Sequence, residues 1–141
     1  MTATADHAGG DRLAGRLGLR PGQVVQELGY DDDCDETLRS GVAELTGSPL
    51  VDEDHEEVVD AVLLWWREDD GDLVDALVDS LVSLGDGGVV WLLTPKVGRD
   101  GHVEPGDIGD AAPTAGLHQT SSIAAASDWS GTRLVTRRSG H

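Results

Sequence analysis

Carboxylates are the most abundant side chains in this sequence that could do chemistry, and several of them gather in one short stretch. Residues 27–36 read ELGYDDDCDE, with Asp31, Asp32 and Asp33 in a row. Carboxylate oxygens are the ligands that Mg²⁺ and Ca²⁺ prefer. The spacing does not match a calcium loop of the helix-loop-helix type, because no glycine occupies the turn position and no spaced glutamate follows. We therefore interpret the stretch as a solvated loop and expect no metal site.

Two further residues could act as a nucleophile or a metal ligand. Cys34, the single cysteine, lies among carboxylates that should raise the pKa of its thiol, although a nearby helix N-terminus would oppose this effect. We expect it to be inert. His55 lies within VDEDHEE and has no second histidine or cysteine at ligand spacing, so we place it at the surface. No nucleophile–base pair is visible, and we predict no catalytic residues.

The negative charge of the chain is strong and uneven. The formal net charge is −17, and residues 31–79 hold 18 acidic and 2 basic side chains, whereas residues 96–141 hold five of each. Such a surface repels phosphate backbones, so nucleic acid is a poor partner. It favours a protein partner with a basic surface, although acidity also serves solubility alone.

Composition indicates a cytoplasmic protein. No apolar run is long enough to span a membrane, and MTATADHAGGDR has no apolar signal core. One cysteine excludes an internal disulfide and fits a reducing compartment. We therefore expect no membrane partner. We expect residues 1–11 to be a disordered tail, 12–138 to be one domain, and 139–141 to be a second tail.

Apolar patterns predict alternating strands and helices. Residues 58–66 form a nearly continuous apolar run, typical of a strand covered on both faces, and Leu73, Leu77, Leu81 and Leu84 line one face of a helix. The predicted strands are 23–28, 49–54, 58–66, 89–94, 118–125 and 132–138, and the predicted helices are 35–46, 72–84 and 107–115. This order indicates an α/β fold with a mostly parallel sheet, closed by an antiparallel hairpin.

The order of elements resembles class I S-adenosylmethionine-dependent methyltransferases. LGLRPGQVVQELG is similar to the entry into their cofactor loop, and DAVLLWW followed by LGDGGVVWLLTPK is similar to the second half of their fold. The resemblance implies a Rossmann-like three-layer sandwich, shortened between the second and fourth strands. If a cofactor binds, the resemblance and position point to Gly29, Tyr30, Asp52 and Trp65.

The chain departs from this family at the loop after the first strand. Where the family has further glycines, this sequence has Gly29 followed by Tyr30 and three aspartates. Side chains there occupy space that the cofactor needs, and carboxylates repel the carboxylate of its methionine part. Asp33 or Asp35 can instead cap the following helix. S-adenosylmethionine is therefore possible but disfavoured, and we predict no cofactor.

Over nearly its whole length the chain resembles a different group. GYDDDCDETLR, VDAVLLWWREDDGDLVDALVD, WLLTPKVGRDGHVEP and SDWSGTRLV are similar to an uncharacterised actinobacterial family of small acidic proteins, a domain of unknown function. This resemblance implies no established activity.

These observations predict a non-catalytic cytoplasmic binding or regulatory protein. It would present an acidic, Trp-containing edge to a basic protein partner, at the carboxyl ends of the strands. The predicted edge comprises Tyr30, Asp31, Asp32, Asp33, Asp52 to Asp54, Trp65 or Trp66, Asp69, Asp70 and Lys96. The alternative is an enzyme, either a divergent methyltransferase or a metal-assisted enzyme using the 31–36 acidic loop.

Overall fold

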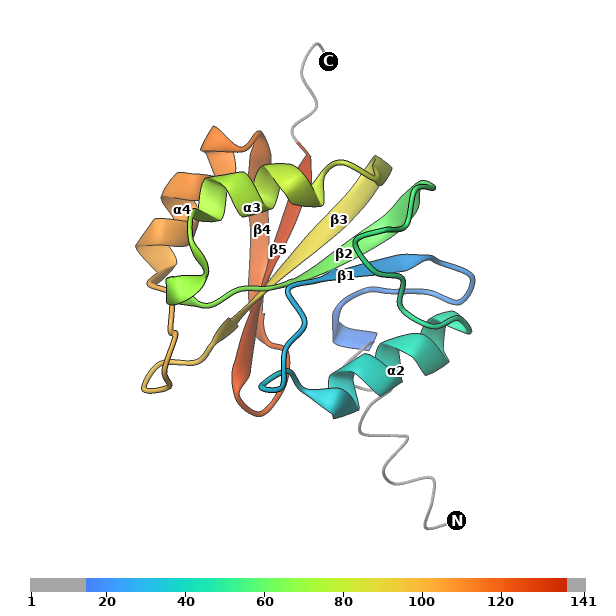
Figure 1. Cartoon of the computed structure of the whole chain (residues 1–141), viewed down its shortest axis with the longest axis horizontal. Helices are drawn as coiled ribbons and strands as arrows, with labels where there is room; N and C mark the ends of the chain where they lie inside the picture. The colour runs from blue at the N-terminus through green and yellow to red at the C-terminus, as the bar shows by residue number, and fades with distance from the viewer. Residues whose placement is uncertain (1–14, 137–141) are drawn as a thin grey trace.

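The computed structural model describes residues 15–136, in which five strands form one twisted sheet (Figure 1). The order of the strands across the sheet is β1-β2-β3-β5-β4. The strands are β1 (Val25–Leu28), β2 (Val59–Trp65), β3 (Leu84–Pro95), β4 (Leu117–Ala124) and β5 (Trp129–Thr136). The helices are α2 (Glu36–Thr46), the short η1 (Glu68–Asp70), α3 (Leu73–Ser80) and α4 (Pro105–Thr114).

The first three strands are parallel, and of the last two only β5 runs antiparallel to them. β1 pairs with β2 and β2 with β3 in the same direction, so their carboxyl ends meet at one edge of the sheet. β5 runs antiparallel to β3 and forms a hairpin with β4. The predicted α/β fold, a mostly parallel sheet ending in an antiparallel hairpin, is confirmed.

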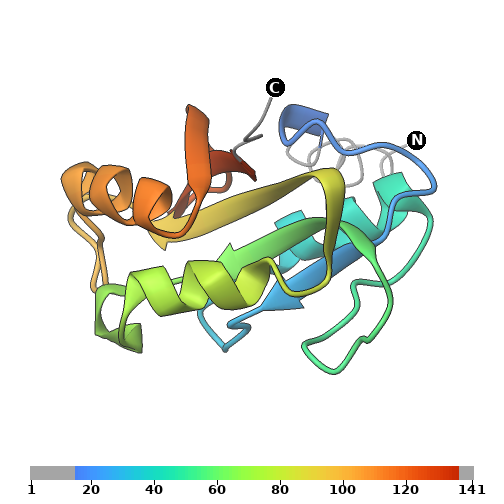
Figure 2. The same ribbon diagram turned by 90° about the horizontal axis from the view of Figure 1, so that it is seen from above.

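Helices cover both faces of this sheet. α2 lies on one face, and α3 and α4 lie on the other (Figures 1 and 2). Alternate residues of each strand point to opposite faces, so β2 sends Leu63 and Trp65 into the core under α2, and Val62 and Leu64 into the core under α3 and α4. This explains the nearly continuous apolar sequence of β2.

Local sequence signals set the ends of α2 and the start of α3. The side chain of Asp35 accepts a hydrogen bond from the N–H of Leu38 at 2.8 Å, and Asp72 accepts one from Asp75 at 3.2 Å. Both aspartates are therefore N-caps, as predicted. Gly47 ends α2 with φ of 84°, a left-handed conformation that glycine adopts without steric cost.

Several predicted boundaries are wrong. α3 ends at Ser80 rather than 84, and Val82 lies on the surface after it. β3 begins at Leu84 rather than 89, because the glycine-rich segment 85–88 continues the strand past an irregularity in its pairing with β2. Residues 49–54, predicted as a brief strand or an extended segment, form a single bridge, between Val51 and Gln26. Predictions for residues 1–11 and 139–141 fall outside the described residues.

None of the helices within residues 15–136 has the length and apolar character needed to cross a membrane.

Candidate functional site

Gly29 ends β1 in a close approach to β2. Its φ is 79°, and a Cβ at this position would clash with the backbone carbonyl oxygen of Trp65. A side chain is therefore excluded both by the backbone conformation and by the neighbouring strand. In this structure the glycine allows two strand ends to meet, which is a packing role that needs no ligand.

Arg67 fills the crevice between the carboxyl ends of β1 and β2. Its Nη1 donates to the carbonyl oxygens of Gly29 at 2.8 Å and Trp65 at 3.3 Å. Its Nε donates to Asp33 Oδ2 at 3.0 Å, and its Nη2 donates to the other oxygen of the same carboxylate. Only 13% of the Arg67 side chain is exposed. The planar guanidinium suits this two-pronged contact with a carboxylate.

Three further neighbours surround the Arg67 side chain. Its Nη1 lies 3.3 Å from Asp70 Oδ2, which also accepts the Arg67 N–H at 2.9 Å. The guanidinium carbon lies 5.2 Å from the centre of the Trp129 ring, a cation–π contact. Gly101 packs so closely that a Cβ there would lie 2.9 Å from the Cβ of Arg67. The arginine therefore fastens three loops together.

Asp33 is the residue of the acidic loop that forms an ion pair with Arg67. The hydrogen bond from Arg67 lowers the pKa of Asp33, against the opposing effect of partial burial. The backbone oxygen of Asp33 accepts a hydrogen bond from Trp129 Nε1 at 3.1 Å. Asp33 is thus an internal ion-pair partner rather than an open carboxylate.

Cys34 is buried beside the same arginine. Its Sγ accepts hydrogen bonds from Arg67 Nη2 and from the N–H of Asp31, each at 3.3 Å. Burial nevertheless raises the pKa of the thiol to about 11, because these contacts only partly offset the loss of solvent. The thiol is therefore protonated at neutral pH, in agreement with the expected lack of reactivity.

A second buried ion pair lies on the α2 side of β1. Glu27, at 7% exposure, accepts two hydrogen bonds from Arg39, at 2.6 and 2.8 Å, and one from Trp65 Nε1 at 2.9 Å. The Arg39 guanidinium carbon lies 4.0 Å from the centre of the Tyr30 ring, and the Tyr30 hydroxyl donates to Glu36 at 2.8 Å. Glu27, the residue before the last one of β1, therefore has its carboxylate paired with side chains of the same chain.

An open cleft of about 1010 Å³ lies next to this crevice, on the α3 face of the sheet. Its floor comes from β1 and from the end of β2, one wall comes from α3, and the other comes from the loop 53–58. Carboxylates are its commonest polar lining: Asp31, Glu53, Asp54, Glu56, Glu57, Asp70 and Asp79. The apolar lining comprises Leu28, Val58, Leu64, Trp65, Trp66, Ala76 and Val82.

The cleft brings together about half of the residues predicted to form the acidic edge. The predicted edge residues that line it are Tyr30, Asp31, Glu53, Asp54, Trp65, Trp66 and Asp70. Trp65 and Trp66 are buried, at 0% and 7% exposure, so each belongs to the core as well.

The other predicted edge residues lie elsewhere. Asp52 lines a smaller neighbouring cavity of about 560 Å³ together with Gly29 and Tyr30. Asp33 is paired with Arg67, Asp32 and Asp69 are exposed, and Lys96 is half-buried just beyond β3; none of these four lines either cavity.

Sequence reasoning missed Arg67 and the contribution of residues 55–58 to the cleft. Arg67 is one of only two arginine or lysine residues between 31 and 79, where 18 residues are acidic. Its position among so many carboxylates was the sequence feature that could have predicted an ion pair within the chain. The surface position expected for His55 is wrong, because it is half-buried. Its Nε2 is buried without a hydrogen-bond partner in the described part of the chain, and it lines the cleft. The position of Val82 in the cleft could not be predicted, because the sequence pattern predicted a helix over residues 72–84.

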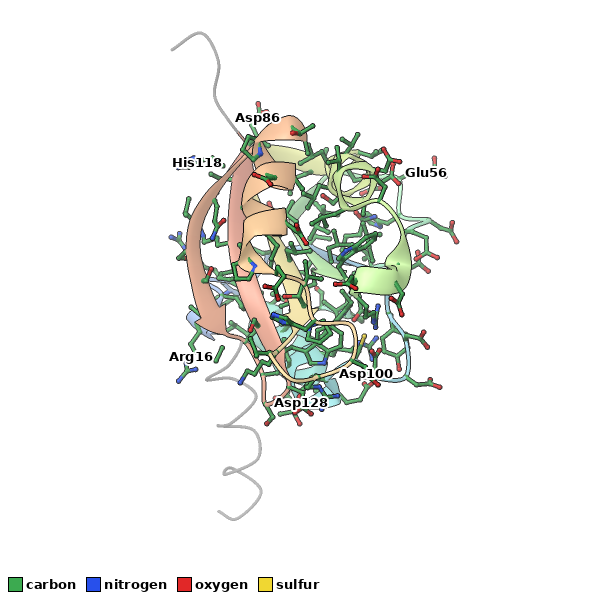
Figure 3. All side chains as sticks on the ribbon, turned by 90° about the vertical axis from the view of Figure 1, so that its left-hand side faces the viewer. Arg16, Glu56, Asp86, Asp100, His118 and Asp128 are labelled. Atoms are coloured by element: carbon green, nitrogen blue, oxygen red, sulfur yellow. The ribbon has the colours of Figure 1, made fainter. Side chains whose placement is uncertain are left out.

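Carboxylates gather on one side of the molecule. Figure 3 shows Glu56 beside α3 on the right-hand side, and Arg16 and His118 on the opposite side. Within residues 15–136 no group of three or more histidine, cysteine or acidic side chains is arranged to hold a metal ion. The geometry thus offers a negatively charged groove with an apolar floor.

Solved structures with a similar fold are S-adenosylmethionine-dependent methyltransferases and their relatives. A methyltransferase from Thiobacillus denitrificans in complex with S-adenosyl-L-homocysteine matches with a TM-score of 0.58 at 10% identity, over 94% of this chain and 91% of that one. A chain of the complex between the Haloferax volcanii Trm112 methyltransferase activator and a putative methyltransferase matches with a TM-score of 0.59 at 15% identity, over 90% and 88%. A methyltransferase from Aquifex aeolicus scores 0.56 at 12% identity, over 89% and 88%. These likenesses show a Rossmann-like methyltransferase fold.

The residues after β1 do not fit a cofactor held in a glycine-rich loop. The space beside Gly29 belongs to the carbonyl of Trp65, and the crevice itself is filled by Arg67. Tyr30 is stacked against Arg39, and the following aspartates carry the wrong charge for the carboxylate of a methionine. The open cleft of about 1010 Å³ lies to one side of this crevice.

Sequence comparison gives closer relatives. An uncharacterised protein of Mycobacterium tuberculosis, Rv2239c, is 50% identical over 135 residues, which are 96% of this chain and 84% of that protein. The uncharacterised protein Mb2263c of Mycobacterium bovis matches equally well. The model of the family described as "Protein of unknown function (DUF3052)" matches residues 14–138. The chain therefore belongs to this family, a group with mycobacterial members and a methyltransferase-like fold.

Proposed function

We propose that the chain is a non-catalytic cytoplasmic binding or regulatory protein whose acidic cleft receives a basic segment of a protein partner. The observation that carries this proposal is the lining of the cleft, in which seven carboxylates surround an apolar floor. Arg67 is the one arginine or lysine among the lining residues, and its charge is taken up by Asp33 and Asp70. The cleft therefore has excess negative charge for a cationic ligand.

The filled crevice supports a non-catalytic role. In open α/β sheets, ligands bind outside the carboxyl ends of the strands. Here that position holds the guanidinium of Arg67 and its partners. The carboxyl ends of the strands, where a cofactor would bind, are therefore filled by contacts within the chain. The adjoining cleft is the surface that can bind a partner.

Paired charge reversals test the proposal. Glu53→Lys with Glu56→Lys changes the cleft, while Asp86→Lys with Asp110→Lys makes the same change in net charge at exposed positions elsewhere. We expect a partner captured from a native lysate by the unchanged protein to be retained by the Asp86/Asp110 variant and lost by the Glu53/Glu56 variant. Equal retention by both variants would exclude the cleft as the binding surface.

The alternative function is a divergent S-adenosylmethionine-dependent methyltransferase. One observation favours it: the cavity of about 560 Å³ is lined by Gly29, Tyr30 and Asp52, three of the four positions at which a cofactor would be expected. Calorimetric titration with S-adenosyl-L-homocysteine separates the two functions. We expect no saturable heat, because Arg67 fills the crevice. Micromolar binding would instead support the methyltransferase.

A further inference from the structure

The helix layer that contains α3 and α4 stops before it reaches β1. α4 packs against β4 and against α3, so the two helices extend from the β4 edge towards β2. The described helix that connects β1 to β2 is α2, which lies on the opposite face (Figure 2). On the α3 face, β1 is therefore bordered by the irregular loop 53–58, and the cleft occupies the position of a further helix beside α3.

The surface of this position has the apolar pattern of a helix-binding groove. Leu28, Leu64 and Trp66 form its floor, and Ala76 of α3 and Val82, which follows α3, belong to one wall. At the end of the cleft near the start of β2, Val82 is 82% exposed and Val58 is 70% exposed. Exposed valines beside a cleft with an apolar floor mark a surface that a partner can cover.

The length of the groove fits a short helix. The cleft is lined at one end by Val58, just before β2, and at the other by Leu64 to Arg67, so its two ends lie about one strand length apart. Seven strand residues span roughly 20–23 Å. A helix of three to four turns covers roughly 16–22 Å, and packed helices lie about 8–10 Å apart.

Strand addition does not fit this surface. The outer edge of β1 is already used by Val51, whose N–H donates to Val25 at 2.9 Å and whose carbonyl accepts from Glu27 at 2.8 Å. The groove offers side chains instead of free backbone groups. Recognition of a helix by side chains in a groove therefore fits better than addition of a strand.

Resting on the proposed function, we infer that the partner contributes a basic amphipathic α-helix that docks beside α3 and completes the helix layer over β1 and β2. Its apolar face covers the floor and the exposed valines. Its lysines and arginines face Glu53, Asp54, Glu56, Glu57 and Asp79 at the two rims.

Two synthetic peptides of identical lysine, leucine and alanine content test this inference with the full chain. One places leucine at the helical repeat, and the other places it at every second position, so that only the first forms an amphipathic helix. Calorimetry measures affinity, and methyl NMR of Leu28, Leu64, Ala76 and Val82 locates the peptide. We expect the helical peptide to bind at least tenfold more tightly and to shift these methyl signals. We expect Glu53→Lys with Glu56→Lys to weaken it, and Asp86→Lys with Asp110→Lys to leave it unchanged.

The other outcomes separate the two proposals. Equal affinity for both peptides, lost in the Glu53/Glu56 variant, would overturn the helix inference and leave the acidic cleft as a binding site. Binding that shifts signals only outside the cleft, or that survives the Glu53/Glu56 reversal, would overturn both. No binding of either peptide would also overturn both.

Discussion

Arg67 and Gly29 together decide what the carboxyl ends of β1 and β2 can do. Gly29 brings the two strand ends into contact, and Arg67 joins their carbonyl oxygens to the acidic loop. The run of aspartates after β1 is consequently only partly a surface feature. Asp33 and Asp35 are used inside the fold, as an ion-pair partner and a helix cap, while Asp31 and Asp32 stay exposed.

Alanine substitution at two glycines distinguishes close approach from backbone conformation alone. Gly29 and Gly47 have similar φ values, 79° and 84°, but a Cβ at Gly47 would meet no atom within 4 Å. We expect Gly47→Ala to lower the free energy of unfolding by about 1 kcal/mol. Gly29→Ala should cost about 3 kcal/mol, because a clash with the Trp65 carbonyl adds to the same strain.

Urea denaturation of both glycine variants measures this difference. Equal losses would show that β1 and β2 can separate at Gly29 without cost, and Arg67 alone would then hold the strand ends together.

At the scale of elements, Asp33 and Arg67 fasten the loop after β1 to the end of β2. Arg67 lowers the pKa of Asp33 in the folded state, so this contact stabilises the fold above the pKa of an unfolded aspartate, about 3.9. The stabilisation is lost as pH falls through the lower, folded value. Because 45% of Asp33 is exposed, we expect Asp33→Asn to cost no more than about 1 kcal/mol at pH 7.

The pH dependence of the unfolding free energy tests the Asp33–Arg67 ion pair. The difference in unfolding free energy between the unchanged protein and Asp33→Asn should be constant from pH 7 to 5 and should shrink below pH 4. Asp69→Asn, an exposed neighbour of the Arg67 contacts, is the control and should leave the curve unchanged. A difference that stays constant down to pH 2 would mean that Asp33 is not ionised against Arg67.

Local sequence signals predicted helix ends and strands correctly where no second signal competed with them. The capping aspartates, Gly47 and the apolar run of β2 each follow from residue type and spacing. The boundary between α3 and β3 did not, because Leu81 and Leu84 continue the helical repeat while the chain has already left the helix. Tertiary packing and strand pairing override propensity there.

The sequence predicted where in the fold the candidate site lies, but it did not predict which side chains contact one another there. Parallel strands place their carboxyl ends together, so Tyr30, Trp65 and Asp70 could be assigned to one edge. The pairing of Arg67 with Asp33 joins residues 34 positions apart, and no local pattern specifies it. Among residues 15–136 no helix covers β1 on the α3 face, and the cleft depends on this arrangement of the helix layer and not on any single residue.

At the scale of the whole molecule, charge and apolar surface lie together on the α3 side. Seven of the 18 acids between residues 31 and 79 line one cleft, because the loops around β1, β2 and α3 meet there. Charge alone would attract any cation, whereas the exposed valines add a requirement for apolar contact. The two contributions can be separated because they respond oppositely to one substitution.

Val82→Asp makes the cleft more acidic and removes an apolar contact. If charge alone drives binding of a basic helix, this variant should bind more tightly. We expect it to bind several-fold more weakly, because a buried carboxylate replaces a valine that the helix covers. Val97, which is equally exposed at 82% but lies outside the cleft, provides the control Val97→Asp. Calorimetric titration with the helical lysine–leucine peptide measures both; a gain in affinity for Val82→Asp would show that the valines do not contact the partner.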